Sequence, residues 1–461
     1  MGKHLELTPR LRQIAAWVRQ GAHLADVGTD HAYLPVWLTL QGRVASAIAS
    51  DLRRGPLDRA QETGRRYGVG DRITFRLGNG LAAVAPEECD TIVIAGMGGE
   101  NIAQILAGAP WTADGRHTLL LQPQSRAEAL RRLRKALRDH TDALCEALRL
   151  DLHKSASESY LTEIGIVLQE IARHLRRLKR WTAGRRVPSP LTILPSGSRI
   201  VPEPLGVVLI VAPWNYPVQL LLNPLVGALS AGNCAVLKSS PLVPHTEALL
   251  KRLIGEVFPP GYVSFLEGGP EVVEEVLKQS FDSIFFTGGS AFGQTVMRAA
   301  AEHLTPLTLE LGGKSPCIVG RDADIPLAAR RIVWGKLLNA GQTCVAPDYL
   351  FVHADRKRQL CVEMERAVRR FFGDDPRLSD DYPRIVSVQV AERLQRMMHG
   401  SGKILFGGTC DPQQRYVAPT LIDEPDDDSP VMRQEIFGPL LPVKGFHDIE
   451  TVIRYVNERD K

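Results

Sequence analysis

Three side chains of the 461-residue chain are of the types that carry out covalent catalysis on a carbonyl compound. Cys344 lies in LLNAGQTCVAP, and it is the only one of the seven cysteines in such an asparagine- and glycine-rich loop; a cysteine thiolate is a strong nucleophile near neutral pH. Glu310, in TLELGGKSP, stands at a predicted strand end, where a carboxylate can serve as general base for water. Asn215, in PWNYP, is held between prolines and aromatic residues, and a fixed amide N–H is the donor that an oxyanion needs. The hypothesis is that the fold brings these three side chains to one cavity.

Two segments between Asn215 and Glu310 favour a dinucleotide coenzyme. GNCAVLK predicts a strand that ends at Lys238, whose ammonium can bond ribose hydroxyls or a phosphate. DSIFFTGGSAFG predicts a strand, a glycine turn that contains Gly288, and the start of a helix that contains Gly293. Backbone N–H groups at such a helix start bind a pyrophosphate.

Together these segments resemble the aldehyde dehydrogenase superfamily, most closely its class 3 branch. The matching motifs are PEPLGVVLIVAPWNYP, AGNCAVLK, FFTGGSAFG, LTLELGGKSP, GQTCVAP and QEIFGP, in that family's order over residues 126–461. The resemblance implies that Cys344 attacks an aldehyde, and that Asn215 with the Cys344 backbone N–H stabilises the oxyanion. Hydride transfer then gives a thioester, and Glu310 activates the water that hydrolyses it.

The resemblance also assigns residues to the coenzyme. Glu435 in EIFGP would bind the nicotinamide ribose, Lys238 the adenosine ribose or its phosphate, and Trp214 would lie beside the coenzyme. The chain departs from the family at Pro241, where a glutamate often holds the adenosine ribose of NAD. A carboxylate there repels a 2′-phosphate and proline does not, so we expect NAD or NADP as coenzyme, with a weakened preference for NAD.

A second set of polar residues follows the predicted strands of the N-terminal region. Asp26, Gly28 and Asp30 come at the end of the first strand, Asp51 ends the second, and Asn79 lies in a Gly-Asn-Gly turn after the third. Open α/β sheets bind ligands at the carboxyl ends of their strands, and a carboxylate there can accept hydrogen bonds from two ribose hydroxyls. The pattern predicts a nucleoside-type ligand.

This region resembles the bacterial tRNA (adenine(22)-N(1))-methyltransferases, which are class I enzymes that use S-adenosylmethionine. ADVGTDHAYLP and IAGMGGE carry the resemblance. It implies that Gly28 lies near the methionine part of S-adenosylmethionine, Asp51 on its ribose and the turn around Asn79 near its adenine, with tRNA as the partner. Asn79 replaces the usual aspartate. Because the resemblance stops near residue 124, before two further strands of the family, we expect a partial methyltransferase domain.

The predicted elements place the chain in the α/β class. Residues 1–124 alternate short apolar strands with helices, which predicts a parallel, Rossmann-like methyltransferase sheet. Residues 125–204 predict arginine-rich helices, interpreted as solvated rather than RNA-binding, and then an extended connection. Residues 205–310 predict the dinucleotide-binding domain and residues 311–461 the catalytic domain of an aldehyde-dehydrogenase-type fold. Family members continue further, so we expect this fold to be incomplete at its C-terminus.

Composition limits the class of protein and the cellular location that we expect. Hydrophobic residues make up 44% and charged residues 23% of the chain, as in ordinary globular proteins, and a net charge of +4 does not by itself imply a nucleic-acid partner. The cysteines show no CxxC spacing, which argues against a disulfide scaffold or metal site and fits a cytoplasmic location. The N-terminus lacks an apolar signal core. Prolines and asparagines interrupt the apolar residues 205–237, which indicates a buried strand, loop and helix rather than a membrane span.

Three hypotheses remain open at this point. The first is an NAD(P)-dependent aldehyde dehydrogenase with an N-terminal fusion, which ranks first because its motif set is longer. The second is a tRNA methyltransferase that uses S-adenosylmethionine and carries a dehydrogenase-like appendage. The third is an inactive fusion of two truncated domains. The resemblance implies a small-molecule aldehyde as substrate and a homodimer, although the family's subunit-pairing segment is expected to be missing.

Overall fold

The computed structural model describes residues 5–7, 9–122, 126–193 and 195–459. The chain divides into two compact units, one of Met1–Ala129 with Pro259–Tyr262 and one of Leu130–Phe258 with Val263–Lys461. The predicted boundary between residues 124 and 125 lies outside the described residues. We describe each unit by itself.

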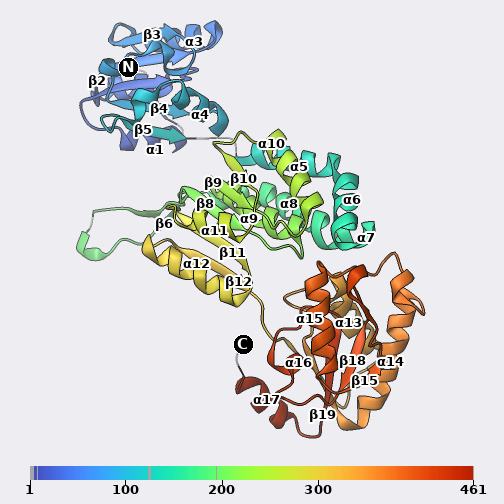
Figure 1. Cartoon of the computed structure of the whole chain (residues 1–461). Coiled ribbons are helices and arrows are strands. Elements are labelled where there is room, and N and C mark those ends of the chain that lie inside the picture. The colour runs from blue at the N-terminus through green and yellow to red at the C-terminus, as the bar shows by residue number, and fades with distance from the viewer. Residues whose placement is uncertain (1–4, 8, 123–125, 194, 460–461) are drawn as a thin grey trace. The chain divides into compact units, whose positions relative to one another are not determined.

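The N-terminal unit is built on a five-stranded parallel sheet in the order β3-β2-β1-β4-β5. Apolar side chains of the central strands, such as Leu24 and Ile92, are fully buried, as expected for a parallel sheet that helices cover on both faces. The strand order reverses beside β1, which is the position where such sheets bind ligands. The predicted strands are all present: β1 (Ala22–Val27), β2 (Val44–Asp51), β3 (Ile73–Leu77), β4 (Thr91–Ala95) and β5 (Thr118–Gln122), with helices α1 (Pro9–Trp17), α2 (Tyr33–Leu40), α3 (Arg54–Arg66) and α4 (Gly99–Ala107) (Figure 1).

The arginine-rich helices predicted after residue 125 follow, and the helical segment is interrupted several times. It consists of α5 (Arg126–Asp139), α6 (Thr141–Leu152), α7 (Ala156–Ser159), the π-helical turn η5 (Tyr160–Ile164) and α8 (Gly165–Trp181). After α6 the backbone of His153 turns into the left-handed region with φ 56°. The interpretation of this charged stretch as solvated is wrong at Lys154 and Glu163, whose side chains are fully buried.

The extended connection predicted up to residue 204 contains a short antiparallel hairpin. Its strands are β6 (Arg185–Val187) and β7 (Ser198–Ile200).

The next sheet is also parallel and five-stranded, in the order β10-β9-β8-β11-β12. The apolar residues 205–237 form a buried strand, a loop, a buried helix and the next strand, as predicted, and Pro224 lies inside the helix rather than ending it. Among the described residues, no helix is both long and apolar enough to span a membrane. The elements are β8 (Val207–Val211), α9 (Pro217–Ala231), β9 (Cys234–Lys238), α10 (Pro244–Val257), β10 (Val263–Leu266), α11 (Pro270–Leu277), β11 (Ser283–Gly288), α12 (Ser290–Glu302) and β12 (Leu307–Leu311).

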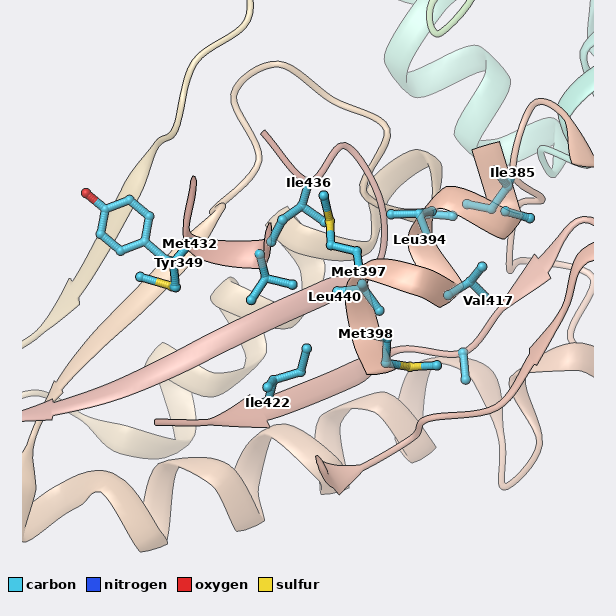
Figure 2. Close-up of a cluster of buried hydrophobic side chains, with 14 of the residues drawn as sticks. Tyr349, Ile385, Leu394, Met397, Met398, Val417, Ile422, Met432, Ile436 and Leu440 are labelled. Carbon is cyan, nitrogen blue, oxygen red and sulfur yellow. The ribbon is translucent and has the colours of Figure 1, made fainter. Parts of the chain in front are cut away.

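The last sheet is mixed, in the order β13-β14-β19-β18-β15, with β15 antiparallel to its neighbour. Figure 2 shows part of its core, in which Leu394 and Met397 lie close to Ile436 and Leu440. Ile436 is fully buried there, so the core anchors the segment that carries Glu435. The elements are β13 (Pro316–Val319), α13 (Ile325–Leu337), β14 (Tyr349–His353), α14 (Ala354–Phe372), α15 (Val388–His399), β15 (Lys403–Phe406), β16 (Cys410–Asp411), β17 (Tyr416–Val417), β18 (Thr420–Asp423), α16 (Pro430–Arg433), β19 (Leu440–Phe446) and α17 (Ile449–Asn457).

Candidate active site

Asn215, Glu310 and Cys344, which lie on three different loops or strand ends, line a single cavity of about 580 Å³. This volume is typical of a small-molecule site. The lining combines apolar surface with a few polar groups, and it includes Pro213, Trp214, Asn215, Gln219, Leu220, Asn223, Pro224, Phe285, Thr287, Gly288, Gly289, Glu310, Leu311, Gly312, Cys344, Glu435 and Phe437.

Cys344 follows a kinked turn at the end of α13. Asn339 and Ala340 in this turn both have a φ of 52°, which is the left-handed region that non-glycine residues rarely adopt. The Cys344 side chain is half-buried. Burial raises the pKa of its thiol, and backbone hydrogen bonds from Cys344 and Val345 partly oppose that rise.

The Asn215 side chain donates one hydrogen bond to the loop that carries Cys344. Asn215 is 3% exposed, and its Nδ2 donates to the carbonyl oxygen of Gln342 over 3.1 Å. Next to it, the Tyr216 hydroxyl and the Thr343 hydroxyl are 2.7 Å apart. Because one N–H of the Asn215 amide is bound in this way, the second remains for a group inside the cavity.

Glu310 is the penultimate residue of β12, which is an edge strand of its sheet. Its side chain is exposed. A carboxylate that lines the cavity and also meets solvent has access to the water that a general base must activate.

Glu435 also lines the cavity, next to the Gly312–Gly313 turn. The backbone N–H of Gly313 donates to Glu435 Oε1 over 3.4 Å. Burial raises the pKa of the Glu435 carboxyl, and this N–H partly opposes the rise. The segment is held in place because the Ile436 N–H donates to Asp348 Oδ1 over 3.1 Å.

The other residues predicted to hold the coenzyme differ in their placement. Trp214 and Gly288 line the cavity, whereas Lys238 and Gly293 are not among its described lining residues. Lys238 is buried, its ammonium donates to the carbonyl oxygen of Ser239, and burial lowers its pKa. A Cβ added at Gly293 would lie 2.8 Å from Leu311 Cδ2, so this glycine permits close packing of α12 on β12.

The N-terminal unit collects its predicted acidic residues at the ends of β1 and β2. Asp26 and Asp51 are buried. Asp51 accepts hydrogen bonds from the backbone N–H groups of Asp30 over 3.3 Å and Arg53 over 3.0 Å. Asp30 itself is exposed and pairs with Arg59 at 2.7 Å. The loop after β1 is thus fastened to the end of β2.

Gly28 occupies a backbone position that favours glycine. Its φ is +74°, and an added Cβ would lie 2.3 Å from Met97 Cε. Asn79, predicted near an adenine, is exposed at the start of a short turn after β3. Both residues lie at the carboxyl edge of the sheet, where a nucleoside would bind.

Comparison with known proteins decides the family. The aldehyde dehydrogenase family model matches residues 95–461. The chain belongs to the aldehyde dehydrogenase family. It is 44% identical over 337 residues to the 4,4′-diaponeurosporen-aldehyde dehydrogenase of Staphylococcus aureus, which covers 73% of each chain. It is 40% identical over 338 residues to the dimeric NADP-preferring aldehyde dehydrogenase of Canis lupus familiaris, which covers 73% of this chain and 74% of that one.

Solved aldehyde dehydrogenase structures show the same fold. The substrate-bound state of Staphylococcus aureus AldH matches with a TM-score of 0.71 and 43% identity, over 73% of this chain and 74% of that chain. A methyltransferase domain model matches residues 7–141. The α/β fold class, the aldehyde-dehydrogenase-type structure and the N-terminal methyltransferase domain are therefore confirmed.

Sequence reasoning missed a group of buried polar residues behind the loop of Asn215. Lys154, Glu163 and Gln342 are all fully buried, and burial raises the pKa of nearby Glu158 to about 7. The sequence offered one signal for Lys154 and Glu163: they are charged residues in a helical stretch with regularly spaced apolar residues. Such charges usually form a solvated face. Only the fold shows that these charges point inward.

Proposed function

We propose that this chain oxidises an aldehyde to a carboxylic acid, with NAD(P) as hydride acceptor and Cys344 as nucleophile. The proposal is supported by one geometric observation, the presence of Asn215, Glu310 and Cys344 on a single cavity, in a chain that belongs to the aldehyde dehydrogenase family.

The first step forms a bond between Cys344 Sγ and the aldehyde carbon. The C=O electron pair moves onto oxygen, and the thiol proton passes to solvent. The free N–H of the Asn215 amide and the backbone N–H of Cys344 donate to the oxyanion, a type of contact that contributes about 10²- to 10³-fold to the rate. The product of this step is a thiohemiacetal.

A bound NAD(P) would supply the hydride acceptor that the conversion of the Cys344 thiohemiacetal to a thioester needs. The residues fit such a coenzyme, because the Gly288–Gly289 turn opens directly into α12 on the cavity lining and presents helix N-terminal N–H groups to a phosphate. Glu435 would bind the nicotinamide ribose, and Trp214 would flank the coenzyme. Lys238 would bind the adenosine ribose or its phosphate.

Glu310 completes the cycle by taking a proton from water. The hydroxide adds to the thioester carbonyl, the C–S bond breaks, and the Cys344 thiolate regains a proton as the acid leaves. An exposed carboxylate suits this step, since water reaches it without a conformational change.

NADP is proposed as a coenzyme alongside NAD. Pro241 is exposed three residues after Lys238, so no carboxylate from this position repels a 2′-phosphate. The canine relative is described as NADP-preferring. Steady-state kinetics with both coenzymes test the point, and strict dependence on NAD with no turnover of NADP would refute it.

The central experiment measures aldehyde-dependent formation of NAD(P)H by the purified chain, with short and long aliphatic aldehydes and an aromatic one. Turnover is expected for the wild type and for Cys410→Ala, which removes a thiol that is not among the described lining residues of the cavity. Cys344→Ala should abolish it. An inactive wild type that binds neither coenzyme nor aldehyde would favour the third hypothesis, the inactive fusion.

A second function is proposed for the N-terminal unit, which matches a methyltransferase domain model over residues 7–141. Buried Asp26 and Asp51 at the reversal of strand order fit binding of S-adenosylmethionine, and methylation of a tRNA adenine is the corresponding reaction. We also propose that the chain is cytoplasmic and forms a homodimer. The canine relative is named dimeric, and light scattering tests the oligomeric state.

A further inference from the structure

A fully buried ion pair lies behind the loop that carries Asn215. Lys154 Nζ donates to Glu163 Oε1 over 2.6 Å, and both side chains are 0% exposed. Lys154 comes from the link between α6 and α7, and Glu163 comes from η5. Burying two charges costs more free energy than their attraction returns unless further hydrogen bonds satisfy them. The other hydrogen bonds of Lys154 and Glu163 therefore indicate which part of the structure the pair stabilises.

Lys154 also forms a hydrogen bond with Asn215 itself. Its ammonium donates to the backbone carbonyl oxygen of Asn215 over 2.9 Å and stands 4.1 Å from the centre of the Tyr216 ring. The same carbonyl accepts a second hydrogen bond, over 2.7 Å, from Asn339 Nδ2. Two donors from different parts of the fold therefore hold the backbone carbonyl of Asn215 in place.

Glu163 fixes the other side of the same loop. Its Oε2 accepts hydrogen bonds from the backbone N–H groups of Val218 over 2.8 Å and Gln219 over 3.4 Å. These N–H groups belong to the first turn of α9, which begins at Pro217 and has no partner for them within the helix. A carboxylate there is also favoured by the helix dipole. Glu163 thus fastens the helix that starts directly after the Asn215 loop.

The ion pair sets the direction of the Asn215 side chain by fixing the backbone that carries it. Because the backbone is fixed, Nδ2 reaches the Gln342 carbonyl, and Gln342 is fixed in turn by donating to the carbonyl of Asn339 over 3.0 Å and accepting from Val386 N–H over 2.9 Å. This leaves the second amide N–H for the cavity beside Cys344.

We propose that Lys154 and Glu163 are positioning residues that hold Asn215 in the geometry of an oxyanion donor. The proposal rests on the role proposed above for Asn215. Neither charge lines the cavity as described, so both act through Asn215 rather than on the substrate. A displacement of the donor by about 1 Å is enough to cost about 100-fold in rate.

The test separates positioning from simple stabilisation by two reactions of the same thiol. Acylation of Cys344 by 4-nitrophenyl acetate passes through an oxyanion and needs no coenzyme, whereas alkylation by iodoacetamide needs only an accessible thiol. For Lys154→Met and Glu163→Gln we expect acylation to fall about 100-fold while alkylation stays within about threefold of wild type. A parallel loss of both rates would overturn the inference, because it indicates a general disturbance of the site.

Two further variants guard against loss of folding. Lys154→Met/Glu163→Leu removes both charges and avoids an unpaired buried ion, which restores stability in comparable cases; the low acylation rate should persist. Recovery of acylation in this variant would show a purely structural pair. Lys357→Met is the control, since Lys357 of α14 also holds a partly buried ion pair, with Asp423 at 2.6 Å, and neither residue is among the described lining of the cavity; both rates should match wild type.

A double-mutant cycle with Asn215 closes the argument. In an Asn215→Ala background, Lys154→Met should reduce acylation by less than about threefold, because the group it positions is gone. Additive losses would exclude action through Asn215. If wild type forms no NAD(P)H and yet acylates in this pattern, the proposed oxidation fails while the positioning role stands.

Discussion

Gly312 and Glu435 lie so close that a Cβ added at Gly312 would stand 2.3 Å from Glu435 Oε2. The Glu435 carboxylate packs against the backbone of the Gly312–Gly313 turn and accepts the N–H of Gly313. Its own segment is anchored by the buried Ile436. The position of the carboxylate proposed to bind the nicotinamide ribose is therefore set by the absence of a side chain at Gly312.

Gly312→Ala should weaken coenzyme binding. The new Cβ displaces the Glu435 carboxylate, and a lost hydrogen bond to a charged group is worth about 1.5–3 kcal/mol. We expect the KM for NAD(P) to rise about 10- to 100-fold, with little change in the rate of Cys344 alkylation. Steady-state kinetics measure the first and mass spectrometry the second. Gly320→Ala is the control, because an added Cβ there meets nothing within 4 Å; an unchanged KM in Gly312→Ala would contradict the assigned role of Glu435.

The residue types of the cavity could be predicted from the sequence, but their supports could not. Cys344, Glu310 and Asn215 stand in short motifs whose composition points to carbonyl chemistry. Lys154 precedes Asn215 by 61 positions, and its burial follows from the packing of η5 and α8 against α9. A local sequence pattern carries no information on such a long-range contact. From the sequence alone, a lysine in a charged helical stretch is therefore predicted to face solvent, even where the fold buries it.

The alkylation rate of Cys344 should rise steadily with pH through the neutral and mildly alkaline range. Burial raises the thiol pKa above its ordinary value of 9.0, and only the thiolate reacts. Below the pKa, each pH unit should therefore increase the rate about tenfold. Iodoacetamide kinetics between pH 6.5 and 8.5 (about two decades expected), followed on the labelled peptide, measure this. A plateau below pH 8 would show that other charges lower the pKa more than burial raises it, and an aldehyde in the assay should slow the labelling.

The N-terminal unit should bind S-adenosylmethionine, and Asp51→Ala should weaken the binding. Loss of a charge-assisted hydrogen bond to ribose costs about 1.5–3 kcal/mol, which weakens the affinity about 10- to 100-fold. Isothermal titration calorimetry on the full chain provides the measurement. Gly55→Ala serves as control, since its Cβ would meet only Arg59 Nη1 at 3.9 Å. Equal affinities for wild type and Asp51→Ala would place the ribose elsewhere.

The sheets were more predictable than the segment that joins them. Strands β1 to β5 and β8 to β12 are short, mostly apolar runs, and the alternation with helices favours their parallel pairing. The break at His153 depends on a left-handed backbone at a residue without a turn signature. The hairpin of β6 and β7 forms from strands of only three residues each, too short for a periodic pattern to appear.

Lys336→Met should stabilise the protein at neutral pH. Lys336 in α13 is 2% exposed, and among the described residues its Nζ has no hydrogen-bond partner. Burial lowers its pKa from 10.5 to about 8, although Asp348 opposes the shift. The unfolded chain therefore binds the proton more tightly, so this residue costs stability at pH 7, and the cost disappears as pH rises from about 8 to 10.5.

The expected gain for Lys336→Met at pH 7 is about 1–3 kcal/mol in the free energy of unfolding. The difference from wild type should shrink at pH 10, where the lysine is neutral in the folded state. Urea denaturation at both pH values, followed by a probe in the C-terminal unit, measures the two differences. Lys179→Met, which removes an exposed lysine of α8, should change stability by less than about 0.5 kcal/mol at either pH. A loss of stability at pH 7 in Lys336→Met would mean that the buried ammonium holds a partner in solution.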